Sequence, residues 1–168
     1  SNFKRVTALC LHGELAVIGI NDDNVSWYTI RHTDGNWELF SYVNTLPPFT
    51  SVYRTLLASA IITDELHLVY SSVESLDCCT SVPHLWHVIR NTNGIWSSFS
   101  EAPYPTGDFR KLVGLAEASV QNELHLLTLK DDGTLQHTIR HADGSWANYV
   151  DVKQMAGDKG KIIAVTAS

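Results

Sequence analysis

The third of three related stretches in this chain reads Leu135-Gln136-His137-Thr138-Ile139-Arg140-His141-Ala142-Asp143-Gly144-Ser145-Trp146. The two earlier copies occupy positions 27–37 and 85–96. In every copy an Ile-Arg pair precedes an Asp-Gly or Asn-Gly turn, and six positions separate the arginine from the tryptophan (31 to 37, 90 to 96, 140 to 146). A repeat that keeps its spacing in this way indicates a fold built from copies of one supersecondary unit.

A second marker precedes each copy, so the repeated unit is longer than the turn motif. The marker is a Glu-Leu pair at Glu14, Glu65 and Glu123. Each unit alternates short β-rich runs with turn signals and shows no helical periodicity. Four short antiparallel strands per unit of this length predict the blade of a β-propeller. We therefore expect one all-β domain over residues 1–168.

The predicted blades span about 3–48, 51–105 and 108–155, with an extra strand at 160–168. From the Glu-Leu marker to the Ile-Arg pair the chain runs 16 residues in the first and third units (14 to 30, 123 to 139) and 24 in the second (65 to 89). The eight additional residues fall at 72–84, around Cys78-Cys79, and predict an enlarged loop between the second and third strands.

Three blades do not close a ring, because propellers have typically 4 to 8. We expect the chain to dimerise into a six-bladed ring, since uncovered terminal blades would expose large apolar patches that soluble monomers rarely tolerate. Two alternatives stay open. The chain could belong to a longer protein, or its last strand could be exchanged with a partner.

Composition narrows the classes of partner. The net charge is −6 with only 12 Lys and Arg residues, which provides no basic field for phosphates, so nucleic acid is not an expected partner. No apolar run approaches the roughly 20 residues of a membrane span, and no charged-then-apolar leader opens the sequence. We therefore expect no membrane insertion.

The cysteines bear on the compartment. Cys10 and the Cys78-Cys79 pair make neither an even disulfide framework nor a metal knuckle. This favours a reducing compartment. Since no signal peptide is seen, we expect the protein to be cytoplasmic or non-classically secreted. One glycosylation sequon, Asn24-Val25-Ser26, points the other way, although such short motifs occur often by chance.

Neither a metal nor a cofactor is expected. His137 and His141 are four positions apart, which on a strand at about 3.3 Å per residue separates them by roughly 13 Å, too far to share an ion. His67 and His125 occupy equivalent positions, but Ala16 replaces them in the first unit. Gly-rich phosphate loops and nucleophile elbows are also missing from the sequence.

The repeated unit, with its Ile-Arg pair, Asp-Gly turn and tryptophan, resembles the blades of tryptophan-rich β-propeller lectins. This group includes tectonins, tachylectin-like proteins and fucose-binding propellers, and the resemblance covers essentially the whole chain. It implies a non-catalytic carbohydrate-binding protein with shallow sites between adjacent blades, where an aromatic ring packs on a sugar and arginine binds its hydroxyls. It also implies glycan partners, repeated sites and, as in some small members, a ring closed by self-association.

The candidate ligand-binding residues are the tryptophans and arginines of the repeat. They are Trp27, Arg31, Trp37, Trp86, Arg90, Trp96, Arg140 and Trp146. Trp27 and Trp86 have no counterpart in the third unit, where Gln136 stands, and an irregular aromatic is a better site candidate than a regular one. As an alternative, the turn tryptophans fill the blade core and each arginine pairs with an acidic neighbour.

Two other function classes compete with the lectin. Propellers also present broad faces to protein partners, so a protein-interaction scaffold is the main alternative. A sialidase-like glycosidase could use the three arginines on a carboxylate, but it also needs an acid and a nucleophile that occur once each. The acidic residues that recur in this chain occupy equivalent positions instead. We predict that the chain is not an enzyme.

Overall fold

The computed structural model describes residues 2–43, 52–75, 81–105, 107 and 112–167. Each sequence unit forms one four-stranded antiparallel sheet with its strands in chain order, which confirms the all-β prediction. Sheet 1 contains β1 (Phe3–Leu11), β2 (Glu14–Asn21), β3 (Ser26–Arg31) and β4 (Ser41–Tyr42). Sheet 2 contains β5 (Val52–Ile62), β6 (Glu65–Ser75), β7 (Ser81–Arg90) and β8 (Ser100–Glu101). Sheet 3 contains β9 (Leu112–Val120), β10 (Glu123–Lys130), β11 (Leu135–Arg140) and β12 (Val150–Asp151).

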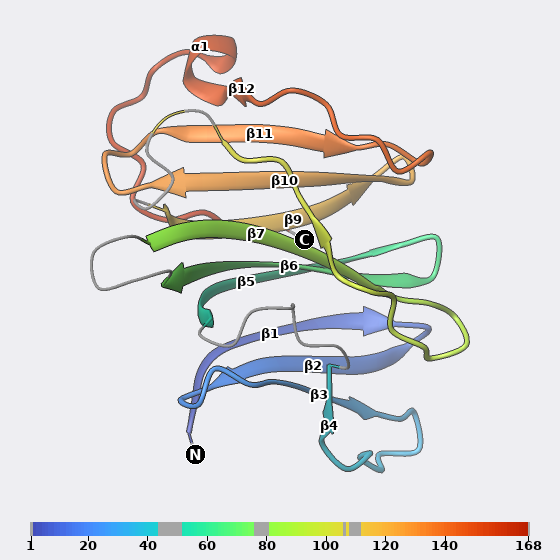
Figure 1. Cartoon of the computed structure of the whole chain (residues 1–168). Helices are drawn as coiled ribbons and strands as arrows, with labels where there is room; N and C mark the ends of the chain where they lie inside the picture. Colours follow the sequence, from blue (N-terminus) through green and yellow to red (C-terminus); the bar gives the residue numbers. More distant parts are fainter. Residues whose placement is uncertain (1, 44–51, 76–80, 106, 108–111, 168) are drawn as a thin grey trace.

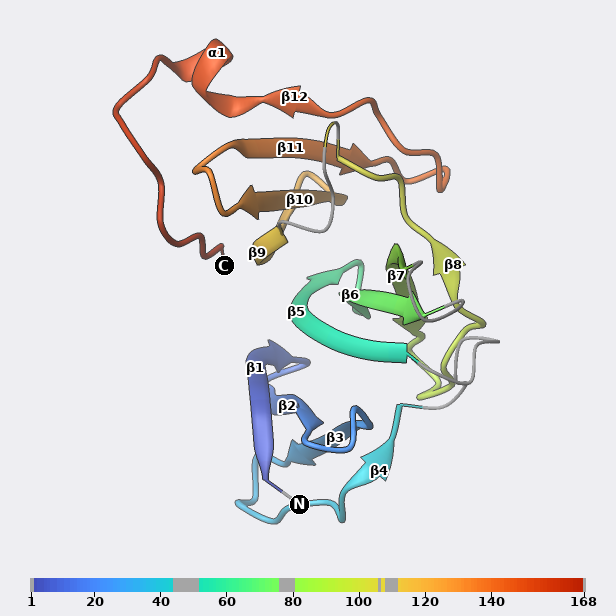
Figure 2. The same ribbon diagram turned by 60° about the vertical axis from the view of Figure 1, so that its left-hand side comes forward.

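The three sheets lie one after another along the molecule (Figure 1). Turned by 60°, they fan out from their first strands, with β1, β5 and β9 lying closest to one another (Figure 2). This radial placement is how propeller blades are set around an axis. The three sheets by themselves do not form a closed ring.

Two apolar clusters hold neighbouring sheets together. One joins sheets 1 and 2 and includes the fully buried Ile18 and Leu68. The other joins sheets 2 and 3 and includes Val69 and Leu126, also fully buried. Sheet 2 is therefore covered on both faces, because it lies between the clusters.

The insertion in the second unit adds strand more than loop. β6 continues to Ser75 and β7 begins at Ser81, and their pairing includes Val73 opposite Pro83. The prediction of a loop is therefore wrong for 72–75 and 81–84, which are strand, whereas residues 76–80, including Cys78-Cys79, lie outside the described residues. β8 pairs only with Trp86 and His87, so this end of β7 is a sheet edge, where proline is tolerated.

The fourth strand of each sheet has only two residues, shorter than the sequence pattern predicts. The tryptophan after each turn forms only an isolated bridge to the arginine of the same unit. Beyond it, the Thr29 hydroxyl donates to the Glu38 carbonyl, and the Thr138 hydroxyl to the Ala147 carbonyl, both at 2.7 Å. These side chains bind backbone carbonyls and so compete with a regular ladder.

The end of the chain also departs from the prediction. Residues 152–156 form a short helix, α1 (Val152–Ala156), capped by the Asp151 carboxylate. The extra strand predicted at 160–168 is not formed over 161–167. The tail instead packs against β9. Its Val165 side chain lies over Gly114, where an added Cβ would come within 3.0 Å of it. Within the described residues, no helix is long and apolar enough to cross a membrane.

Candidate functional site

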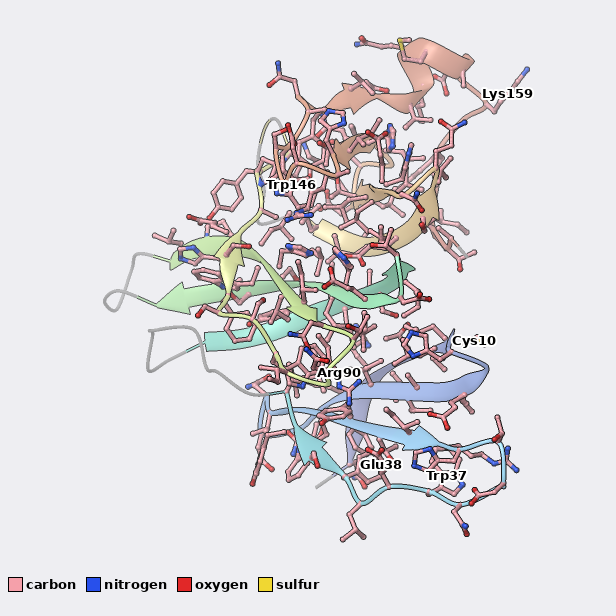
Figure 3. The ribbon with its side chains drawn as sticks, turned by 90° about the vertical axis from the view of Figure 1, so that its right-hand side faces the viewer. Cys10, Trp37, Glu38, Arg90, Trp146 and Lys159 are labelled. Atoms are coloured by element: carbon pink, nitrogen blue, oxygen red, sulfur yellow. The ribbon has the colours of Figure 1, made fainter. Side chains whose placement is uncertain are left out.

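One joint between sheets occurs twice in the molecule. At the first junction the Trp96 ring meets the Tyr28 ring edge to face at 5.4 Å, and the Arg90 guanidinium lies 5.3 Å from the same ring. At the second junction the Trp146 ring meets the His87 ring edge to face at 5.8 Å. Figure 3 shows Arg90 and Trp146 at these two junctions. In both, the turn tryptophan of one sheet packs on the third strand of the preceding sheet.

A pair of imidazole rings lies beside the second joint. His67 Nδ1 and His87 Nε2 are 3.0 Å apart, and both side chains are buried. Burial and the nearby charge of Arg140 lower the pKa of His67 to about 4. Burial, His67 and Arg140 lower the pKa of His87 to about 3. Both rings are therefore neutral near pH 7, one donating its N–H to the other.

Sheet 3 repeats this histidine pair on its outer face. His125 Nδ1 and His137 Nε2 are also 3.0 Å apart, but these rings are partly exposed. Partial burial and His125 lower the pKa of His137. In sheet 1 the equivalent positions hold Ala16 and Tyr28.

A cavity of about 220 Å³ opens at the junction of sheets 2 and 3. It is lined by Ile62, Thr63, Glu65, His67, Asn122, Arg140, His141 and Ala142. Its walls come from the β5–β6 turn of one sheet, and from the β9–β10 turn and the end of β11 of the next. We call this cavity the junction pocket. It brings together a guanidinium, a carboxylate, an amide and two imidazoles.

The carboxylate in the junction pocket differs from its two equivalents. Glu14 accepts a 2.7 Å hydrogen bond from His32, and Glu123 has the same 2.7 Å contact with His141. In the second unit, asparagine replaces that histidine. The Asn91 side chain accepts from backbone N–H groups of its own turn. Glu65 is therefore the one member of this set with no hydrogen-bond partner within the described chain.

Only one of the predicted site residues, Arg140, lines the junction pocket. Trp86 is 7% exposed and donates its Nε1–H to Ser72, and Trp96 is 9% exposed. These two rings offer little face to a ligand, because Trp96 packs in the first junction and Trp86 stacks on His84 of its own sheet. Trp146 is half-buried on His87, in agreement with the core-packing alternative.

Arg90 lies over Tyr28 at the first junction, and the other three predicted residues lie on or near the free face of sheet 1. Arg31 is exposed and Trp37 is 52% exposed. Trp27 is half-buried. Its ring lies 4.1 Å from the tilted ring of Tyr42 and borders an open hollow with Phe3, Asn21 and Phe40. The structure therefore does not gather the eight predicted residues into equivalent sites.

Glu65 is not among the residues that the sequence predicted for a site. Its recurrence at Glu14 and Glu123 suggested a structural role. The signal was present directly after the arginine of each repeat, where His32 and His141 have Asn91 as their counterpart. As for metals, no three His, Cys, Asp or Glu side chains of the described residues gather closely enough to hold an ion.

No protein-family model matches the chain, and no curated protein matches it in sequence. Its fold is similar to part of TcdA4 of Morganella morganii, known from a cryo-EM structure, with a TM-score of 0.62 and 14% sequence identity. The match covers 85% of this chain and 7% of that chain. At such low identity the likeness shows the fold alone.

Proposed function

We propose that the chain is a non-catalytic carbohydrate-binding protein whose three sheets are propeller blades, with a sugar site in the junction pocket. The observation that carries this proposal is the Glu65 carboxylate, which has no hydrogen-bond partner among the described residues although its two equivalents do, in a pocket also lined by Arg140. All three copies share the requirements of the fold, so a residue that differs in one copy only is a candidate for binding.

The chemistry of the junction pocket suits a sugar. Neighbouring hydroxyls of a pyranose both donate and accept hydrogen bonds, so they need a forked donor and an acceptor in the same pocket. Arg140 supplies the fork, Glu65 the acceptor, and Asn122 either one. At about 220 Å³ the pocket is smaller than the roughly 300–1,000 Å³ of drug-sized sites. It fits a single monosaccharide unit.

Such a site is weak by itself. Two copies of the pocket on one rigid assembly would raise avidity on a glycan-covered surface by about 10² or more, without any new contact. This advantage is one reason for a small repeat lectin to self-associate.

A glycan array followed by calorimetric titration of the best monosaccharide tests the proposal. Arg140→Ala and Glu65→Gln are expected to weaken binding at least about tenfold, because each removes a charge-assisted hydrogen bond worth about 1.5–3 kcal/mol. Arg90→Ala is the matched control, since it removes the equivalent arginine at the first junction. Circular dichroism checks that all three variants fold.

The outcomes separate the competing functions. An equal loss of sugar affinity in the Arg90 and Arg140 variants would show that the sugar does not bind in the junction pocket. Absence of any glycan signal from the folded wild type would contradict the lectin proposal. Release of a fluorophore from a glycoside would instead indicate a glycosidase.

A protein-interaction scaffold is the second candidate. The observation in its favour is the aromatic surface of sheet 1, where Trp37, Phe40 and Tyr42 are each at least half exposed. An exposed patch of this kind marks an interaction site in many soluble proteins.

A further inference from the structure

We propose that the junction pocket selects sugars that carry a free ammonium group, and that the Glu65 carboxylate binds this group. The inference rests on the sugar site proposed above and adds the chemical class of its ligand. It follows from how the charged groups around the pocket are paired, because a charge that the protein does not pair itself is offered to a ligand.

The junction pocket leaves one carboxylate without a counter-charge. Glu65 is half-buried, and it has neither a hydrogen bond nor an ion pair within the part of the chain that the structure describes. By contrast, Glu123 lies 2.7 Å from His141, and Glu14 lies 2.7 Å from His32. Of the three equivalent glutamates, only Glu65 therefore presents a negative charge that no side chain of its own sheet shares.

Arg140 lines the same pocket but is not the partner of Glu65. Its guanidinium folds back over its own turn, since a Cβ on Gly144 would lie 3.3 Å from Nη2. That turn contains Asp143. Hydrogen bonds from Ser145 lower the pKa of Asp143, and the charges of His141 and Arg140 lower it further. The charge of Arg140 is thus partly balanced within its own turn, and its N–H groups can still donate to sugar hydroxyls.

The rest of the pocket does not oppose a cation at Glu65. Burial and the nearby charge of Arg140 lower the pKa of His67 to about 4, so this ring is neutral near pH 7. The uncharged residues that complete the lining are Ile62, Thr63, Asn122 and Ala142. An ammonium group at Glu65 would therefore supply the charge that the pocket itself lacks.

The turn of the second unit closes without the histidine that would have paired with Glu65. In the first and third units, Asp34 and Asp143 each accept a backbone N–H of their own turn at 2.9 Å. In the second unit Asn91 takes over this task from the histidine position, accepting from the N–H groups of Asn93 and Ile95. The exchange of histidine for asparagine therefore leaves the hairpin intact and changes only what Glu65 can bind.

An amino sugar suits this arrangement better than a neutral sugar. Its ammonium group donates charge-assisted hydrogen bonds to a carboxylate, and these are about twice as strong as the hydrogen bonds of a neutral hydroxyl. The ring hydroxyls keep Arg140 and Asn122 as partners. N-acetylation removes the positive charge, so an acetylated amino sugar loses the advantage.

Calorimetric titration at about pH 6, where an amino sugar carries its proton, tests the preference. The probes are glucosamine and galactosamine, each compared with its neutral hexose and with its N-acetyl form. The better amino sugar is expected to bind about tenfold more tightly than either of its comparisons, and the difference should shrink at high salt. n-Butylamine, which has the ammonium group but no sugar ring, is expected to bind more weakly than the amino sugar.

Variants test the role of Glu65. Glu65→Gln is expected to abolish the preference for the amine, whereas Glu14→Gln, at the equivalent position in sheet 1, is the matched control and should keep it. The double variant Asn91→His/Asn93→Asp gives the second turn the residues of the third. It is expected to reduce the preference as well, because the new imidazole can pair with Glu65. Circular dichroism checks that each variant folds.

The outcomes distinguish this inference from the sugar site on which it rests. Equal affinity for the amino sugar and its two neutral forms would overturn the amine preference and leave the sugar site standing. Absence of binding by every sugar would contradict both. A Glu65→Gln variant that keeps the full preference would show that the ammonium group binds elsewhere. Butylamine binding as tight as that of the amino sugar would also overturn the inference, and would indicate a lysine side chain of a protein partner.

Discussion

Glu117 is the least expected side chain at the scale of single residues. It is 2% exposed, and neither carboxylate oxygen makes a well-aligned hydrogen bond within the described residues. Burial raises its pKa well above the usual value, against a smaller lowering by the Val69 backbone N–H. Together with burial, Glu117 also raises the pKa of Tyr149. A buried carboxyl without partners costs free energy in the folded state.

We expect Glu117→Gln to stabilise the protein at neutral pH. The unfolded carboxyl ionises freely above pH 4.5, whereas the folded one resists ionisation, so wild-type stability falls as pH rises toward the folded pKa. A neutral amide removes that penalty. The melting temperature is expected to rise by roughly 2–4 °C for each 1 kcal/mol gained.

Differential scanning calorimetry at several pH values checks this expectation. The difference between variant and wild type should shrink as the pH is lowered toward 4.5, since both forms are then neutral. A variant less stable than the wild type at neutral pH would show that the carboxylate has a favourable partner.

The turn hairpin is the informative feature at the scale of elements. The glycine of each turn has positive φ, at +91° for Gly35, +80° for Gly94 and +89° for Gly144. A Cβ on Gly94 would also lie 3.0 Å from the Arg90 guanidinium. The arginine side chain thus folds back over its own turn, and the fixed six-residue interval reflects that packing as well as the bridge to the tryptophan.

Two alanine substitutions separate backbone strain from this contact. Gly13 has nearly the same φ, +81°, but a Cβ there would meet nothing within 4 Å. Gly13→Ala is expected to cost about 1–2 kcal/mol, the usual penalty for the left-handed region. Gly94→Ala is expected to cost more, because the guanidinium must also move. Urea unfolding of both variants measures the difference, and equal costs would mean that Arg90 shifts freely.

At the scale of the whole molecule, stability depends on how sheets bury polar groups between them. The His67–His87 pair lies within the second junction, with pKa values of about 4 and 3 against an ordinary 6.5. In the unfolded chain both rings take up protons below about pH 6.5. The folded state therefore loses stability as the pH falls from about 6.5 toward 4, because only the unfolded state binds the protons.

We expect His87→Gln to reduce this acid sensitivity. The variant is expected to be less stable than the wild type at pH 7, because it loses packing against Trp146, but its melting temperature should fall less between pH 6.5 and pH 4. His12→Gln, on an exposed turn, is the control. If the melting temperature of His87→Gln falls between pH 6.5 and pH 4 by as much as that of the wild type, the acid-sensitive groups lie elsewhere.

Local sequence was sufficient for most of the strands, but not for α1. Alternating apolar residues, Asp-Gly turns and a constant six-residue interval predicted three units of four short strands each, and twelve strands are present among the described residues, without the extra strand predicted at 160–168. These signals act between residues close in the chain, so no tertiary information was needed. The same reasoning missed the lengthened β6–β7 hairpin, because strand and loop residues are not distinguished by an insertion count.

Tertiary structure alone decided which copies of the motif are buried and which are free. Trp37 and Trp96 follow equivalent turns, yet one is 52% exposed and the other 9%, because burial depends on the neighbouring sheet and not on the motif. Likewise, Glu65 shares its marker with Glu14 and Glu123, but it lines the pocket with Arg140, because sheet 3 lies against sheet 2 there and Asn91 replaces the histidine that binds the other two glutamates. Repeated sequence determines the units of this protein. The number and order of their neighbours determine which repeated residues are structural and which remain free to bind.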